Sequence, residues 1–588
     1  MEKWFVAAKK ADFDRWAEEF HISPVLARIL RNRDLTDESQ VEKFLRGTLR
    51  DCYSPWLLKD MDRAVKLILE AIEQGVRMRV IGDYDVDGIC SSYILTKGFG
   101  LLGAKVDTAI PHRIHDGYGL NEHLIREAAG DGIGMIVTCD NGIAAASQIA
   151  MAAEMGLQVI VTDHHEVPFE LAEDGSRREL LPPALAVIDP KRVGCSYPFP
   201  EICGGVVAYK LLRALAEESG SRELTEALEE FLELAALATV CDVMVLKDEN
   251  RILVKEGLRR LKNTRNQGLR ALMEVNSLRP EHLNAYHLGF VIGPCLNATG
   301  RLDTAGRALD LLQSKTKAEA MSAARELKEL NDSRKNLTAR GVEQAEDYIK
   351  EHHMEQDKVM LIFLPEVHES LAGIIAGRIR ERYNHPVFLL TRGEEGVKGS
   401  GRSMEGYHMY EAMTAVKQYF IKFGGHAMAA GLSMREEDIE PLRQALNDGC
   451  KMAEEDFVPR VHIDVPMPLD YAKEEIADEM ELLEPFGVGN PKPLFAQKDL
   501  IFLAGYLMGA NGNFARYQVR TPEGNIKQLV FFGELQKFDS FLDEKYGPGS
   551  AAALYGGGAS LQVSVVYQLG KNTYRGRTEV QYLMQHYC

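Results

Sequence analysis

The sequence predicts an α/β protein in which a parallel, doubly wound sheet is joined by a long helix to a smaller α/β domain, followed by a small β-barrel. Residues 61–190 alternate between short apolar strands and helix-like segments, which is typical of a parallel sheet. Residues 313–352 form one long, charged, amphipathic segment, and a second alternation of strand and helix follows it. From residue 460 onward the chain consists of short strands and turns, which favours a barrel.

The length of 588 residues requires several domains, because one domain usually holds roughly 100–200 residues. We predict five segments from the changes in pattern. They are an N-terminal segment at 1–60, the first α/β domain at 61–255, a helical region with the connecting helix at 256–352, the smaller α/β domain at 353–455 and the β-barrel domain at 456–588.

The composition is that of an ordinary globular protein, with 45% hydrophobic and 27% charged residues. No apolar run approaches the length of a membrane span, and the first residues lack the apolar core of a secretion signal. The nine cysteines are scattered and include no C-x-x-C pair, which indicates reduced thiols. We therefore expect a cytoplasmic protein without membrane contact, and nothing in the sequence requires more than a monomer.

The overall charge of −18 argues against nonspecific binding to nucleic acid, because affinity for phosphate comes from clustered Lys and Arg. Residues 501–588 differ, since they hold eight basic and six acidic residues and are rich in Tyr and Phe. A small barrel with interleaved aromatic and basic residues suits single-stranded nucleic acid, and a basic hairpin tip is expected at 570–577. An ordinary β-domain with aromatic residues in its core is the alternative interpretation.

Polar residues follow each of the first four predicted strands. Asp83, Asp85 and Asp87 follow the first strand, and the segment 111–119, which includes Arg113, follows the second. Because the carboxyl ends of parallel strands meet at one edge, these groups should converge there. Crowded carboxylates repel each other, so a hard divalent metal is the simplest partner, whereas a solvated acidic loop is the alternative. The five strands are expected at 78–82, 105–110, 134–139, 157–162 and 184–188, with Asp140 after the third and Asp163, His164 and His165 after the fourth.

Asp242 is an acidic residue in the apolar stretch 231–246, which also contains Glu233. A buried carboxylate is unfavourable unless it is paired or bound to a metal. Asp242 is therefore a further candidate ligand, although a residue that caps a helix would also explain it.

Three glycine-rich segments carry groups that suit a phosphate. They are expected to be loops at 293–301, 399–403 and 423–431, where small residues let backbone amides approach a phosphate closely. Arg402 and His426 would add charge or hydrogen bonds. The sequence contains no G-x-x-x-x-G-K-[ST] loop, so no ATP-driven motor is expected.

Several motifs together resemble those of the DHH phosphoesterase superfamily. The resemblance rests on Asp83-Tyr-Asp-Val-Asp-Gly88, Asp140-Asn-Gly142 and Asp163-His-His165, with Asp242 beyond them. The later segments 293–301, 368–378, 399–403 and 424–431 are similar to those of the bacterial RecJ nucleases. This resemblance implies a two-lobed DHH phosphoesterase core, a DHH-associated domain and a C-terminal OB-like barrel.

RecJ-type nucleases hydrolyse single-stranded DNA in the 5′→3′ direction with Mn²⁺ or Mg²⁺ and act in DNA repair and recombination, so the resemblance implies a two-metal site here. Asp140 would be the bridging carboxylate, His165 would lie beside the scissile phosphate, and Asp163 would orient the neighbouring imidazoles. The implied partners are single-stranded DNA, a helicase and a single-strand-binding protein. The implied metal ligands are Asp83, Asp85, Asp87, Asp140, His164 and Asp242.

The same resemblance implies a group of substrate-binding residues that grip the strand and its terminal phosphate. One departure stands out, because Cys295 occupies a position where the family usually has Arg, and this removes a cation near the phosphate path. The implied substrate-binding residues are Arg113, Asn297, Arg301, His368, Ser400, Arg402 and His426.

Two other functions remain open at this point. A phosphodiesterase of the same superfamily could act on small nucleotides or oligoribonucleotides, but it would not need the basic and aromatic domain at 500–588. A non-catalytic scaffold associated with replication could keep the fold, but the complete set of Asp and His residues argues against it.

Overall fold

The computed structural model of the chain describes residues 2–112, 119–171, 176–302, 304–393, 396–574 and 577–588. These residues form two compact units. The larger unit contains Tyr53–Met244 and Glu256–Pro459, and the smaller one contains Met1–Cys52, Val245–Lys255 and Arg460–Cys588. None of the described helices combines the length and the apolarity needed to cross a membrane.

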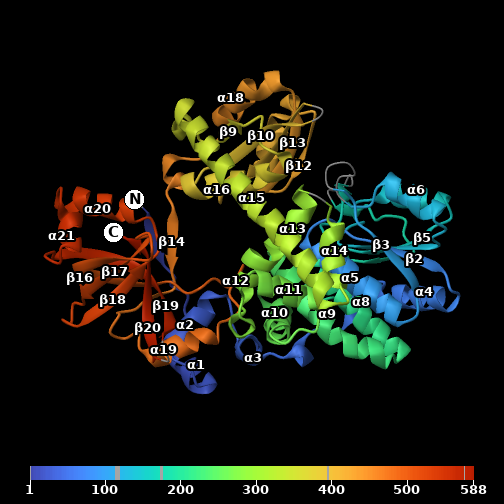
Figure 1. Cartoon of the computed structure of the whole chain (residues 1–588), viewed down its shortest axis with the longest axis horizontal. Helices are drawn as coiled ribbons and strands as arrows, with labels where there is room; N and C mark the ends of the chain where they lie inside the picture. Colours follow the sequence, from blue (N-terminus) through green and yellow to red (C-terminus); the bar gives the residue numbers. More distant parts are fainter. Residues whose placement is uncertain (1, 113–118, 172–175, 303, 394–395, 575–576) are drawn as a thin grey trace. The chain divides into compact units, whose positions relative to one another are not determined.

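The larger unit is built on a parallel five-stranded sheet with the order β3-β2-β4-β5-β8 (Figure 1). Every neighbouring pair in it is parallel. Each predicted strand is present within two residues of its expected ends, and the predicted doubly wound fold is confirmed. The strands are β2 (Arg77–Ile81), β3 (Lys105–Ala109), β4 (Met135–Cys139), β5 (Gln158–Thr162) and β8 (Ala186–Ile188).

Helices cover both faces of this sheet. The largely buried α5 (Val86–Leu101) and α8 (Gly204–Ser219) pack on one face, and α9 (Arg222–Cys241) packs on them. The apolar residues of α6 (Glu122–Gly130) and α7 (Ala146–Glu154) pack on the other face. Since both faces are covered, the carboxyl edge of the sheet is the place left for polar groups.

The region between the two α/β parts is helical, and one prediction for it was wrong. Residues 293–301 do not form a loop, because α13 (Gly293–Leu302) contains them all. Its glycines serve close packing, since a Cβ at Gly293 would collide with Cys241, and a Cβ at Gly300 would lie 2.6 Å from the carbonyl oxygen of Tyr84. The other helices here are α11 (Gln267–Val275), α12 (Ala285–His287), a π-helix (Leu288–Ile292), α14 (Gly306–Gln313) and the long connector α15 (Lys317–Glu351).

The smaller α/β part has a mixed sheet with the order β12-β13-β11-β10-β9 and the helix α16 (Glu369–Tyr383). The predicted glycine-rich turn at 399–403 was wrong, because most of its residues lie in the strand β11, whereas the segment 423–431 contains a short turn at 426–428 between β12 and β13. A Cβ at Gly399 would collide with Leu390, so glycine is needed for the packing of the strand against its neighbour. The strands are β9 (Met360–Phe363), β10 (Val387–Gly393), β11 (Gly396–Arg402), β12 (Lys422–Gly425) and β13 (Ala429–Met434).

The smaller unit contains a five-stranded barrel that closes where the first strand, β16, pairs with both β17 and β19. Many of its aromatic residues lie inside, among them Phe502, Tyr517 and Tyr567. The predicted barrel is therefore confirmed, and much of its aromatic content belongs to the core. The strands are β16 (Phe495–Met508), β17 (Phe514–Arg520), β18 (Ile526–Phe531), β19 (Leu561–Tyr574) and β20 (Arg577–Tyr587).

The N-terminal helices α1 (Phe13–Phe20), α2 (Pro24–Asn32) and α3 (Glu38–Arg46) share one hydrophobic core with this barrel. Arg251 strengthens this core, because its buried guanidinium lies 3.8 Å from the ring centroid of Phe44 and donates hydrogen bonds to three carbonyl groups. The sequence pattern gave no sign that a segment so far from the barrel in the chain would pack on it.

Candidate metal centre

The loop after β2 and the first turn of α5 carry three carboxylates, Asp83, Asp85 and Asp87, to the carboxyl edge of the sheet. Asp85 caps α5, since its side chain accepts a hydrogen bond of 3.1 Å from the amide of Gly88. Asp83 is buried and accepts a bond of 3.3 Å from the amide of Gly119. The local fold therefore fixes these side chains before any ligand binds.

Asp87 belongs to the first turn of α5, but its side chain faces the N-terminus of a second helix, α8. Its two carboxylate oxygens accept hydrogen bonds of 2.7 Å from the amides of Gly204 and Gly205. A negative charge is favourable at this end of a helix. A Cβ at Gly204 would lie 2.7 Å from the Cβ of Asp140, so glycine lets the helix approach both carboxylates. We did not predict this role, although a Gly-Gly pair at the start of an apolar helix is a visible signal.

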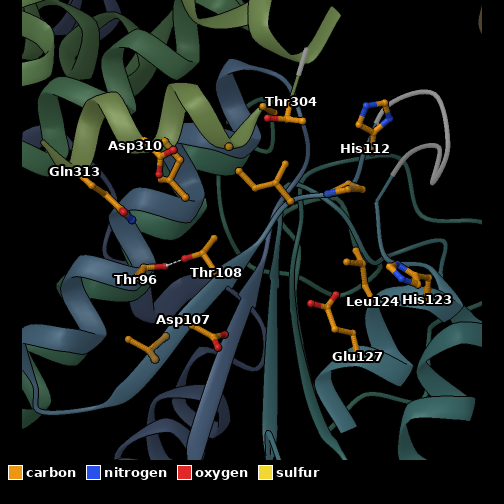
Figure 2. A pocket seen from close by; sticks show the side chains of 16 residues that line it. Thr96, Asp107, Thr108, His112, His123, Leu124, Glu127, Thr304, Asp310 and Gln313 are labelled. Carbon is orange, nitrogen blue, oxygen red and sulfur yellow. Dashed lines mark hydrogen bonds between the residues drawn. The ribbon is translucent and has the colours of Figure 1, made fainter. Parts of the chain in front are cut away.

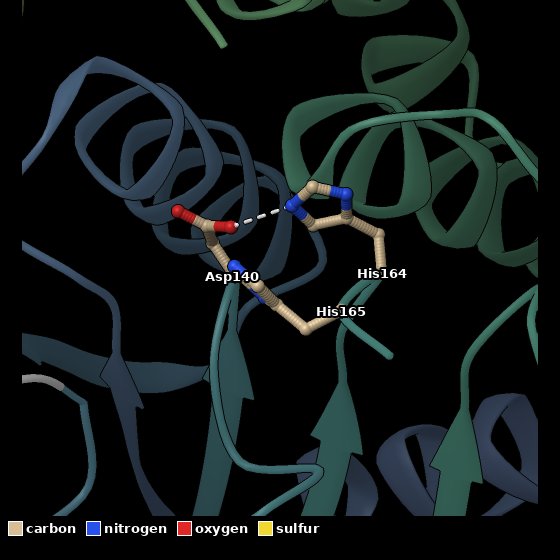
Figure 3. A group of neighbouring side chains, drawn as sticks. All are labelled: Asp140, His164 and His165. Carbon is tan, nitrogen blue, oxygen red and sulfur yellow. Dashed lines mark hydrogen bonds and ion pairs between the residues drawn. The ribbon is translucent and has the colours of Figure 1, made fainter. Parts of the chain in front are cut away.

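The imidazole of His164 lies at the centre of the cluster. Its Nε2 is 3.1 Å from Oδ1 of Asp140, 3.5 Å from Oδ2 of Asp87 and 3.7 Å from Oδ2 of Asp242. Figure 3 shows Asp140, His164 and His165 side by side at the ends of neighbouring strands. Among the described residues, two groups have ligand atoms that lie within 4.8 Å of one another, namely Asp140, His164 and His165, and Asp87, His164 and Asp242.

Asp163 does not face the other carboxylates but holds the strand end and one imidazole. Its side chain accepts a bond of 2.9 Å from the amide of Ile143 and one of 2.7 Å from Nδ1 of His165. Its contact with His164 is to the backbone amide, at 2.8 Å. Burial raises the pKa of Asp163, but these bonds and the charge of His165 outweigh it and hold that pKa below its usual value.

The two histidines differ in their surroundings. Burial lowers the pKa of His165, but the hydrogen bond and charge of Asp163 outweigh this and raise it to about 9. Burial is also the main cause that lowers the pKa of His164. In the described part of the chain, Nδ1 of His164 is a buried atom without a hydrogen-bond partner. Nε2 of His164 is therefore the nitrogen that the carboxylates surround.

The buried carboxylates of the cluster lie close enough to repel one another. Burial and the nearby charges of Asp87 and Asp85 raise the pKa of Asp140 well above its usual value, and the same causes raise that of Asp242 to about 8. Asp242 also ends α9, where the helix dipole disfavours an anion. Carboxylate oxygens and an imidazole nitrogen suit Mn²⁺ or Mg²⁺, so the residues present fit divalent metals.

The position of Asp140 depends on its own backbone conformation and on the side chain of the next residue, Asn141. Asp140 itself has a φ of 60°, a left-handed conformation that is uncommon for residues other than glycine and concentrates at functional sites. The buried amide of Asn141 donates to the carbonyl groups of Ile81, at 3.1 Å, and Cys139, at 2.9 Å, and its oxygen accepts a bond of 3.2 Å from the amide of Leu120. Asn141 therefore ties three loops together, a role that we had not predicted.

A second group of predicted residues lies around the first turn of α16. Ser400 and Arg402 share one face of β11, and Nη1 of Arg402 donates a bond of 3.0 Å to Oγ of Ser400. A Cβ at Gly373 of α16 would lie 2.6 Å from Nη2 of Arg402, so both side chains reach the helix. His368 caps the same helix through its bond to the amide of Ser370.

Helix α13 connects this group with the loop of carboxylates. Arg301 donates a bond of 2.7 Å to the carbonyl group of Ser370, and the preceding Gly300 packs against Tyr84. Asn297 is half-buried one turn earlier on α13. The remaining predicted residues are His426, which is exposed in the turn between β12 and β13, and Arg113, which lies outside the described residues.

Cys295 lies in the packing between helices. Its side chain is fully buried, and Nδ2 of Asn331 lies 3.4 Å from its Sγ. Asn331 in turn accepts two bonds from the guanidinium of Arg334, at 3.1 and 2.9 Å. Burial raises the pKa of the thiol. This environment favours a packing role for Cys295 over a place on the phosphate path.

A cavity of about 640 Å³ lies beside the edge strand β3 (Figure 2). Its described lining includes Asp107, Glu127 and Asp310, and Asp107 is paired with Arg79 at 2.7 Å. None of the described lining residues is a predicted metal ligand. The arrangement of ligand atoms, and not this cavity, therefore identifies the site.

The barrel presents an exposed aromatic and basic strip. Tyr506 and Arg516 are exposed cross-strand neighbours on β16 and β17, and the ring of exposed Phe532 stacks on that of Phe514 at 4.8 Å. In the described part of the predicted basic hairpin, Lys571 is paired with Asp478 and Glu481, and Arg575 lies outside the described residues.

Comparison with known proteins gives a consistent result. The chain matches the DHH family N-terminal domain at 77–239, the DHHA1 domain at 356–452 and the RecJ OB domain at 463–586. It is 36% identical to the single-stranded-DNA-specific exonuclease RecJ of Salmonella typhimurium, over 81% of this chain and 83% of that one. It is 32% identical to the enzyme of the same name from Escherichia coli, over 96% of both chains.

Solved structures agree with these sequences. The crystal structure of RecJ in complex with Mn²⁺ from Thermus thermophilus matches with a TM-score of 0.80 and 27% identity, over 100% of this chain and 79% of that one. The structure of RecJ from the same organism in complex with Mg²⁺ matches with a TM-score of 0.74 and 26% identity, over 100% and 78% of the two chains.

Proposed function

The chain belongs to the RecJ family of single-stranded-DNA-specific exonucleases, and we propose that it hydrolyses single-stranded DNA from the 5′ end to mononucleotides. The observation that carries this proposal is the convergence of carboxylates around His164 at one edge of the sheet. The metal complexes of related RecJ structures support Mn²⁺ or Mg²⁺ as the cofactor.

The chain offers enough ligands for two metal ions. Asp140 would bridge them, since its carboxylate lies beside His164 and faces the charges of both Asp87 and Asp242. When bound, divalent metals supply positive charge that polarises the phosphodiester and makes a water more acidic. The proposed ligands are Asp83, Asp85, Asp87, Asp140, His164 and Asp242.

His165 is the proposed contact to the scissile phosphate. Its side chain is 44% exposed, whereas that of Asp163 behind it is 1% exposed. Because Asp163 holds Nδ1, Nε2 is the ring nitrogen that would donate a hydrogen bond to a phosphate oxygen. The carboxylate of Asp163 fixes the tautomer and the direction of the ring and favours its protonated form.

The group around α16 is the proposed site for the 5′-terminal phosphate. Ser400, Arg402 and His368 lie at the N-terminal end of this helix, where the dipole and a guanidinium both favour an anion. Arg301 connects this end to α13, which packs on the metal loop. Such an arrangement would place the terminal nucleotide between the phosphate site and the metals. Contacts of Asn297, His426 and Arg113 with the same DNA strand are assigned by family resemblance alone.

The barrel would bind the rest of the single-stranded DNA. Tyr506 and Phe532 offer ring faces for bases, and Arg516 offers a charge for the backbone. A helicase and a single-strand-binding protein as partners, a monomeric state and a cytoplasmic location remain predictions that accompany this proposal.

The test compares nucleotide release from several substrates with Mn²⁺ and with excess EDTA. A 5′-phosphorylated single strand should release 5′-end label at once and 3′-end label late, and the matching duplex should be resistant. Faster cleavage of a dinucleotide or cyclic dinucleotide than of the long strand would favour a small-nucleotide phosphodiesterase. No release from any substrate would favour a non-catalytic scaffold.

A further inference from the structure

Two aromatic rings stand exposed on the helical part of the larger unit. Tyr286 in α12 is 62% exposed, and Phe290 in the π-helix that follows is 66% exposed. The two rings stack with centroids 4.9 Å apart and an interplanar angle of 22°. Aromatic side chains normally bury most of their surface in a core or an interface, so a stacked pair left open indicates a contact surface.

The segment that carries this pair is anchored on the end of α9. The segment that carries it packs on the end of α9, where a Cβ at Gly289 would lie 3.3 Å from Val240. Sγ of Cys241 donates a weak bond of 3.6 Å to the carbonyl group of Leu288. The next residue is Asp242, a proposed metal ligand that lies within 3.7 Å of Nε2 of His164. The segment that carries the two rings therefore packs against the helix end that immediately precedes Asp242.

The backbone under the rings is well fixed. The side chain of Asn284 accepts a bond of 3.3 Å from the amide of His287, and Nδ1 of His287 accepts one of 3.2 Å from the amide of Asn284. This reciprocal cap encloses Tyr286, whose ring also meets that of His287 edge-on at 5.9 Å. Ordered aromatic rings lose little conformational entropy when a flat ligand stacks on them.

We propose that Tyr286 and Phe290, on the segment that packs against the helix end before Asp242, form a stacking platform for bases of the single-stranded substrate. The inference rests on the proposed function, which supplies unpaired bases at this place. A base presents a flat face that a ring can cover, and stacking tolerates any sequence. Bases in a duplex have their faces covered by neighbours, so the platform also favours a single strand over a duplex.

The experiment measures binding without hydrolysis, by fluorescence anisotropy in excess EDTA. Two labelled oligonucleotides of equal length are compared, one with adenine bases and one with abasic sites throughout. Removing both rings in the double variant Tyr286→Ala/Phe290→Ala should raise Kd for the base-bearing strand about 5- to 150-fold and leave Kd for the abasic strand unchanged. The double variant Tyr286→Trp/Phe290→Trp should bind like the wild type.

Two further variants separate stacking from other effects. Tyr286→Leu/Phe290→Leu keeps apolar bulk without rings and should lose affinity like the alanine pair. Trp56→Ala is the matched control, since Trp56 is a 38% exposed aromatic that donates to Glu217 at the far end of α8, about 20 Å along that helix from Gly204. It should change neither Kd.

Other results would overturn the inference. Equal losses on both strands, or full affinity in the leucine variant, would mean that the rings serve packing or an apolar protein contact instead of base stacking. Failure of the proposed function is a separate result, because it would appear as absent Mn²⁺-dependent release of nucleotides by the wild type.

Discussion

The substitution Gly204→Ala tests whether the position of Asp140 governs activity. An alanine Cβ at this first residue of α8 would lie 2.7 Å from the Cβ of Asp140, 3.0 Å from its Cα and 3.1 Å from its Oδ1. Nonpolar carbon atoms normally meet at about 3.5–4.0 Å, so one of the two must move by about 1 Å. Because Asp140 directly follows a buried strand and Gly204 begins a buried helix, neither can move without disturbing the cluster.

The expected effect on activity is larger than that on stability. A displacement of about 1 Å at a catalytic group costs about 100-fold in rate. Overpacking lowers the free energy of unfolding by about 1–3 kcal/mol, whereas replacing a helical glycine by alanine raises it by about 0.5–1 kcal/mol. At about 2–4 °C per kcal/mol, Tm should fall by no more than about 10 °C.

The assay pairs steady-state hydrolysis of a 5′-phosphorylated single strand in Mn²⁺ with a thermal melt. Gly100→Ala is the matched control, since Gly100 also lies in a helix, α5, but a Cβ there meets nothing within 4 Å. The control should keep full activity and melt at the same temperature or slightly higher. A folded Gly204→Ala protein with activity near that of the wild type would refute the reasoning.

Three other predictions concern the phosphate path, the terminal phosphate and the barrel. Cys295→Arg should lower Tm without lowering KM, because Cys295 is fully buried beside Asn331; a stable variant with a lower KM would instead place it on the phosphate path. Arg402→Gln should raise KM about 10-fold or more for a 5′-phosphorylated strand, since a charge-assisted bond contributes about 1.5–3 kcal/mol. An equal rise for a 5′-hydroxyl strand would contradict the assignment of Arg402. Tyr506→Ala/Arg516→Gln should raise Kd for long strands and reduce the salt slope by about 0.7, the value for one phosphate. Unchanged affinity and slope in equilibrium binding would show that this strip does not hold DNA.

The sheet and its polar edge could be predicted because both depend on local patterns. Five apolar runs have strand length, and the first four are each followed by Asp, His or Arg, which fixes the order of the polar loops in a parallel sheet. The structure accordingly brings Asp87, Asp140, His164 and Asp242 together from four separate loops and helix ends.

Glycine was the main source of error. In the segments at 293–301 and 399–403, glycine indicates close packing of a helix or strand, and not a turn. Local propensity cannot distinguish these cases, since the reason for the glycine is a neighbour such as Cys241 or Leu390 that is distant in sequence.

Contacts between distant segments could not be predicted either. Helices α1–α3 share their core with the barrel, so deletion of residues 500–588 would expose that core and is not a clean test of DNA binding. Point substitutions on the barrel surface are the better test. Likewise, the amide groups of Gly204 and Gly205 that bind Asp87 come from a helix more than a hundred residues away.

Asp140→Asn is the most direct test of the proposed two-metal centre. Asparagine keeps the shape of the side chain and tolerates the left-handed backbone at this position, where φ is 60°. It removes the charge that would bridge both metals. The variant should melt like the wild type and release no nucleotides from 5′-phosphorylated single-stranded DNA in Mn²⁺. Hydrolysis at the wild-type rate by this folded variant would contradict a metal centre bridged by Asp140.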